Sequence, residues 1–104
     1  MTNQRNNSSD QLKQVADGQF LISGDLDFQT VPGVLKASQS LFANNKSITI
    51  DLSGVNSSNS AGLALLLEWM RYANSNAHSL TFLHLPDQMK QIAQLCGVDD
   101  KLPV

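Results

Sequence analysis

Four side chains in this sequence are of the types that hydrolases use, namely Ser60, Asp51, His78 and His84. A hydroxyl, a carboxylate and an imidazole form a nucleophilic triad when the fold brings them within hydrogen-bond reach. The serine is not embedded in a G-x-S-x-G nucleophile elbow, and the sequence has neither a G-x-x-x-x-G-K phosphate loop nor Cys/His spacing suited to zinc. A small hydrolase or nucleotide-binding enzyme is therefore the least favoured hypothesis, and we expect no catalytic residue, metal site or cofactor.

Ser60 lies where a predicted strand leads into a predicted helix. The turn Asn59-Ser60-Ala61-Gly62 opens a very apolar helix. The first backbone N–H groups of a helix have no partner within it and carry the positive end of its dipole, so this turn suits negative charge or a docking partner. Helix capping by Asn and Ser, with Gly62 allowing close packing of helix and sheet, is the simpler alternative.

The elements around this turn follow from the spacing of apolar residues. The period predicts strands at 12–15, 20–23, 48–52 and 79–85, helices at 31–43, 60–74 and 87–96, and a polar loop at 53–59. Asp17-Gly18 predicts an antiparallel hairpin between the first two strands, Thr30 and Asp87 are expected helix caps, and Gly97 is expected to end the last helix. Strands that then alternate with helices predict parallel crossovers. The expected fold is an α/β sandwich with a mixed four-stranded sheet and three helices.

The helix at 60–74 has more apolar surface than one sheet should cover. On a helical wheel, its apolar side chains span an arc of about 220°, whereas packing on one sheet needs an arc little wider than about 100°. Leu65, Trp69 and Tyr72 lie in this arc, and Trp and Tyr are common at binding hot spots. We interpret the excess as a candidate protein interface. The alternative is that neighbouring helices cover both flanks and that the tryptophan belongs to the core.

Composition narrows the choice of partners. The chain has 104 residues, 41% of them hydrophobic and 15% charged, with a net charge of -2, which is typical of one globular domain, expected at 11–104. The few basic residues are scattered, which argues against nucleic acid and direct membrane insertion. Residues 1–10 read as a disordered polar tail. With no signal peptide or spanning segment apparent, the lone Cys96 suggests a cytoplasmic location, where it would be a small buried hydrophobe.

Three segments, in this order, resemble the STAS domain family. They are Ser23-Gly24-Asp25-Leu26-Asp27, similar to the family's G-E-L-D; Ile50-Asp51-Leu52-Ser53-Gly54-Val55; and Asn59-Ser60-Ala61-Gly62-Leu63, similar to D-S/T-S/G-G-L. Residues 62–67 and the ending 95–103 are most similar to the MlaB-like members. The resemblance implies a STAS-like α/β sandwich that binds other proteins and is not an enzyme.

Two partners follow from this resemblance. An MlaB-like protein would be an accessory subunit that binds the cytoplasmic MlaF-like ATPase of a phospholipid ABC transporter, which maintains outer-membrane lipid asymmetry, and would be peripheral to the inner membrane through that partner. An anti-sigma factor antagonist would instead bind an anti-sigma kinase and be phosphorylated at Ser60. The family aspartate before this position is Asn59 here, which removes a charge that a kinase could read. The candidate partner-binding residues are Asn59, Ser60, Ala61, Gly62, Leu65, Trp69 and Tyr72, and a homodimer through the same surface stays open.

Overall fold

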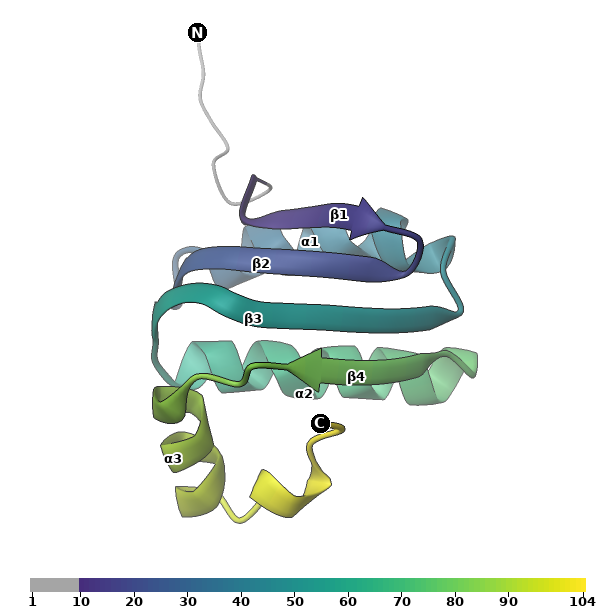
Figure 1. Cartoon of the computed structure of the whole chain (residues 1–104). Coiled ribbons are helices and arrows are strands. Elements are labelled where there is room, and N and C mark those ends of the chain that lie inside the picture. The colour runs from purple at the N-terminus through teal and green to yellow at the C-terminus, as the bar shows by residue number, and fades with distance from the viewer. Residues whose placement is uncertain (1–9) are drawn as a thin grey trace, which may run out of the picture.

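Four strands form one mixed sheet in the computed structural model, which describes residues 10–104. The strand order is β1-β2-β3-β4, with β1 antiparallel to β2 and the remaining pairs parallel (Figure 1). This is the predicted mixed sheet with its opening hairpin. The predicted disordered tail lies almost wholly outside the described residues.

The opening hairpin joins β1 (Leu12–Ala16) to β2 (Gln19–Leu26). Gly18 takes a left-handed conformation with φ of 70°. An added Cβ there would lie 2.3 Å from the carbonyl oxygen of Ser47, so only glycine fits between the turn and the next strand. The hairpin prediction from Asp17-Gly18 is confirmed.

Strand β3 (Ser47–Ser58) is more than twice as long as its predicted segment. Its second half, predicted as a loop, pairs in parallel with β2 as far as Leu26 opposite Ser58. The pairing contains irregularities between Leu21 and Ser23 and between Gly24 and Asp25. Such bulges interrupt the alternation of inward and outward side chains, so the polar stretch did not look like a strand.

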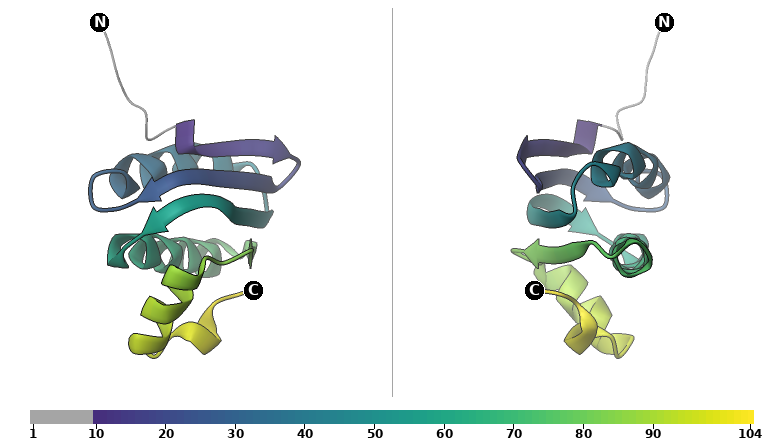
Figure 2. Two further views of the ribbon diagram at one scale, coloured as in Figure 1. Left: turned by 60° about the vertical axis from the view of Figure 1, so that its left-hand side comes forward. Right: turned by 90° about the vertical axis from the view of Figure 1, so that its right-hand side faces the viewer.

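Two helices, α1 (Val31–Ala43) and α2 (Ser60–Asn76), cover the same face of the sheet (Figure 2). The apolar side chains of the strands point toward them and form one core. Its largest fully buried members are Trp69, Phe20, Phe42, Phe82, Ile22, Leu26, Ile48, Ile50, Leu52, Leu65, Leu66 and Met89. The ring of Phe42 on α1 packs against Trp69 on α2 with 5.4 Å between centroids, so the two helices close the core together.

The last part of the chain lies beyond the outer edge of β4 (Ser79–Leu83). It comprises α3 (Asp87–Leu95) and a 3-10 helix, η2 (Asp99–Lys101), and Pro103 accepts a backbone hydrogen bond from Phe82 on β4. Strand β4 ends two residues earlier than predicted, because His84 adopts a left-handed φ of 57°.

Two local predictions, about the cap of α3 and the cysteine, are wrong. Thr30 holds the N-cap position of α1 as predicted, although its side chain makes no capping hydrogen bond and Asp27 accepts the N–H groups of Gln29 and Thr30. Asp87 is the first residue of α3 and Pro86 holds the cap position, so the side chain of Asp87 caps nothing. Cys96 is exposed, because α3 ends at Leu95 and the thiol faces away from the core.

Candidate functional site

The turn before α2 has the geometry that its sequence predicts. Asn59 is the N-cap, and its side-chain oxygen accepts a hydrogen bond from the N–H of Ala61 at 2.8 Å. Asn59 and Ser60 are exposed, whereas Ala61 and Gly62 are buried. The hydroxyl of Ser60 is therefore displayed on the surface at the positive end of a 17-residue helix.

The next two residues have structural roles. The N–H of Gly62 donates to the carbonyl of Asn59, so Asn59 satisfies both this group and that of Ala61. A Cβ on Gly62 would meet the hydroxyl of Ser58 at 2.1 Å and Cε of Met89 at 2.9 Å. The capping and close-packing explanation therefore accounts for Asn59, Ala61 and Gly62, which leaves Ser60 as the residue of this turn that packing does not explain.

Hydrogen bonds connect this turn to its neighbours at the carboxyl ends of β2 and β3. The N–H of Asn59 donates to the carbonyl of Leu26, and the N–H of Ser58 donates to the side-chain oxygen of Gln88 on α3. The hydroxyl of Ser57 donates to the carboxylate of Asp25 at 3.0 Å. We call this surface the carboxyl edge, defined by residues 25–30, 57–60 and 87–88.

The surplus apolar surface expected on α2 is mostly buried, and Leu67, at 37% exposed, is the large apolar side chain of this helix that remains exposed. Leu65 and Trp69 are each 1% exposed, so neither is available as a surface anchor. Tyr72 is half-buried, with its ring 6.2 Å from that of Phe42 and 5.3 Å from that of His78. It also lies twelve residues beyond Ser60, about 18 Å along the helix. The alternative explanation is the right one, because α1 covers one flank of α2 and Met89 of α3 packs against the other.

The side chains of the suspected triad do not come together around Ser60. His84 Nδ1 lies 2.9 Å from an oxygen of Asp51. Asp51 stands between the buried Ile50 and Leu52, so it faces away from the helices. A hydrogen bond from the N–H of Ser53, helped by His84, lowers the pKa of Asp51. The pair is thus an exposed link between β3 and the end of β4, and the triad hypothesis is wrong.

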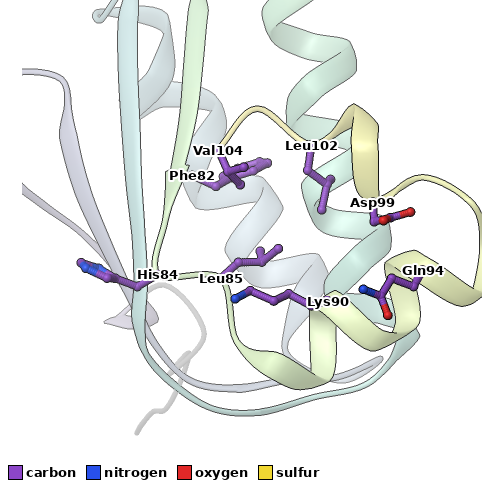
Figure 3. Close-up of a pocket in the computed structure, with 8 residues that line it drawn as sticks. All are labelled: Phe82, His84, Leu85, Lys90, Gln94, Asp99, Leu102 and Val104. Carbon is purple, nitrogen blue, oxygen red and sulfur yellow. The ribbon is translucent and has the colours of Figure 1, made fainter.

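A cavity of about 420 Å³ lies between β4, α3 and the end of the chain (Figure 3). It is lined by Phe82, His84, Leu85, Lys90, Gln94, Asp99, Leu102 and Val104. Its inner wall is apolar, and the ring of His84 points away from it. The cavity does not include Ser60, so it is separate from the carboxyl edge.

Phe28 is the residue of the carboxyl edge that sequence reasoning missed. Its side chain is 72% exposed in the connection between β2 and α1. Apolar periodicity does not indicate it, because a single aromatic residue between Asp27 and Gln29 belongs to no periodic pattern. Its signal was a large apolar side chain inside a polar connection directly after a strand.

Residues 10–104 contain neither a cluster of metal ligands nor a membrane-spanning helix. No three His, Cys, Asp or Glu side chains in this part of the chain are grouped so as to hold a metal ion. Among the helices that the structure describes, none has the length and apolar character needed to cross a bilayer.

Comparison with known proteins identifies the family. The family model described as Mlab, STAS domain matches residues 10–103. The chain therefore belongs to the STAS domain family, and the model that it matches is the MlaB-like one. No curated protein matches the chain.

Solved structures agree on the fold. An anti-sigma factor antagonist from Mycobacterium paratuberculosis aligns with a TM-score of 0.70 at 23% identity, over 88% of this chain and 80% of that one. The Bacillus cell fate determinant SpoIIAA in its phosphorylated form aligns with a TM-score of 0.65 at 24% identity, over 88% and 86%. The anti-sigma factor antagonist SpoIIAA in its unphosphorylated form gives 0.63 at 24%, over 82% and 81%.

Proposed function

We propose that this chain is a protein-docking subunit that binds the MlaF-like ATPase of a phospholipid ABC transporter through the carboxyl edge. It would act at the cytoplasmic face of the inner membrane, held there by its partner and without inserting into the lipid. The match of residues 10–103 to the MlaB-like family model supports this choice of partner.

The observation that carries the proposal is the exposed Ser60 on a rigid surface. The turn is fixed by the Asn59 cap, and hydrogen bonds connect it to both β2 and α3. A partner would meet a surface that needs little ordering, which lowers the entropy lost on binding. A small hydroxyl at this position allows close approach and supplies both a donor and an acceptor.

Replacing Ser60 by Arg tests the docking site. A long cation at this position should abolish co-purification with the ATPase subunit while the circular dichroism spectrum stays unchanged. The matched control is Ser40→Arg, which places the same charge on an exposed position of α1. Undiminished binding by the Ser60→Arg protein would overturn the placement of the site.

A second candidate is an anti-sigma factor antagonist that is switched by phosphate on Ser60. Its support is the exposed Ser60 hydroxyl and the fold shared with such antagonists. Phosphate would add a charge of about -1.5 to -2 to a carboxyl edge that already contains Asp25, Asp27 and Asp87, and the N–H of Ala61 is already occupied by Asn59. These features make it the weaker candidate. Intact mass after incubation with ATP and the cognate kinase, with Ser60→Ala as control, decides between the two.

A further inference from the structure

Phe28 has no structural role that explains its exposure. It is the one strongly exposed aromatic side chain in the part of the chain that the structure describes; Trp69 and the other three phenylalanines are buried. An exposed ring contributes little to the core, and aromatic side chains are frequent at binding hot spots, so its position at the carboxyl edge fits a role in binding.

The backbone around Phe28 is held in one conformation by hydrogen bonds on both sides. The carboxylate of Asp27 accepts from the N–H groups of Gln29 and Thr30 at 2.8 and 3.0 Å. The hydroxyl of Thr30 donates to the carbonyl of Asp25 at 2.8 Å and accepts from the N–H of Asp27 at 3.0 Å. Phe28 is therefore presented by an ordered loop, and binding through its ring would lose little backbone entropy.

The same loop is attached to the turn that carries Ser60. Leu26 is opposite Ser58 in the parallel pairing, and the N–H of Asn59 donates to the carbonyl of Leu26. Phe28 and Ser60 each lie two residues beyond this pair of strand ends. Adjacent strands are about 4.8 Å apart, so the two residues follow neighbouring points of the sheet. Both connections lie at the same end of the sheet (Figure 1).

The charges around Phe28 have one sign. Asp25 and Asp27 both precede it in the sequence, Asp87 begins α3 at the same end, and the carboxyl edge as defined contains no lysine or arginine. Lys90, one turn further along α3, lies 4.0 Å from Asp87 and only partly offsets this charge. A partner with basic residues would complement this rim.

We propose that Phe28 is an aromatic anchor that inserts into an apolar pocket on the partner protein, and that Lys or Arg residues border this pocket. The inference rests on the proposed function, because it places the anchor and Ser60 on one docking surface. It adds what the partner must present, namely a pocket for one phenyl ring within a positively charged surface.

The test measures the affinity of single variants for the purified MlaF-like ATPase subunit. Phe28→Ala should raise the dissociation constant by about tenfold or more, as expected for a hot-spot residue, and Phe28→Leu should restore part of the affinity. Leu95→Ala, which removes an 88% exposed side chain from α3, is the control and should bind like the parent protein. Asp87→Asn should slow association and weaken its dependence on salt.

The outcomes separate the two proposals. If the unaltered protein does not bind the ATPase, the proposed function fails; if it binds but Ser60→Arg binds equally well, the placement of the docking site at Ser60 fails. If Ser60→Arg abolishes binding while Phe28→Ala binds like the parent, the docking site stands and the anchor is overturned. An affinity loss in Leu95→Ala equal to that in Phe28→Ala also overturns it.

Discussion

The indole Nε1–H of Trp69 donates a hydrogen bond to the hydroxyl of Ser38 across 2.9 Å, inside the contact between α2 and α1. The same hydroxyl donates to the carbonyl of Leu35 at 2.6 Å. Both side chains are nearly inaccessible, at 1% and 2% exposed. Ser38 thus supplies the acceptor that allows a tryptophan to be buried completely in so small a domain.

Ser38→Ala should lower the free energy of unfolding by about 1–3 kcal/mol, because it leaves a buried indole N–H without an acceptor. Urea unfolding followed by circular dichroism measures the change. Ser40→Ala, at an exposed position of the same helix, should stay within about 0.5 kcal/mol of the parent. Equal effects of the two substitutions would contradict a structural role for the bond.

Gly62→Val should destabilise the fold by about 1–3 kcal/mol through overpacking. The added atoms would collide with Ser58 and Met89, because both already lie closer to an added Cβ than van der Waals contact allows. Ala64→Val, at an exposed position of the same helix, introduces the same side chain without this collision. Thermal unfolding of the pair checks the prediction, and a Gly62→Val protein as stable as its control would refute it.

Asp51→Asn should reduce stability at neutral pH by less than about 1 kcal/mol, because the pair with His84 is exposed to solvent. The folded protein lowers the pKa of Asp51 below that of an ordinary aspartate. The stabilisation from the charged carboxylate of Asp51 is therefore complete above the ordinary aspartate pKa of about 3.9. It is lost as the pH falls through the lowered pKa of the folded protein.

The measurement for this pair is the difference in unfolding free energy between parent and Asp51→Asn as a function of pH. The difference should narrow toward zero below about pH 3.9. Asp100→Asn, an exposed aspartate of η2, serves as the control. A difference in unfolding free energy that stays constant down to acid pH would show that the charge of the Asp51 carboxylate does not stabilise the fold.

Cys96 should react with one equivalent of a thiol reagent in the folded protein, because its side chain is exposed. Cys96→Ser should change the free energy of unfolding by no more than about 0.5 kcal/mol. A disulfide reagent that releases a coloured thiol on reaction is used, and the absorbance of that thiol measures the labelling of Cys96. Labelling that occurs only after urea is added would mean that the thiol is covered.

Apolar periodicity predicted the fold because each core element has a regular pattern. Ile48, Ile50 and Leu52 alternate along β3 and all three are buried, as expected. The period could not reveal the second half of β3, since the bulged pairing with β2 breaks the alternation there. Gly97 ends α3 as predicted, with a φ of 72° directly after the C-cap Cys96, but the apolar pattern wrongly placed Cys96 in the core.

The sequence predicted only the part of the candidate site that depends on local helix-capping preferences. Asn59 and Ser60 lie at the helix start as their residue types suggest. The apolar arc of α2 wrongly predicted a surface interface. A helical wheel does not show how many neighbours a helix has, and α1 and α3 cover both flanks of α2. Phe28 joins the site through strand register, which places Leu26 opposite Ser58, and no single segment contains that information.

Trp69 is the single tryptophan of the chain and is buried, and this determines which fluorescence assays are informative. Its emission should shift strongly when the core opens to water, yet change little when another protein docks near Ser60, because the indole is fully buried. Unlabelled protein therefore has an intrinsic reporter of folding and none of association. A dye coupled to the accessible thiol of Cys96 would supply the missing second signal.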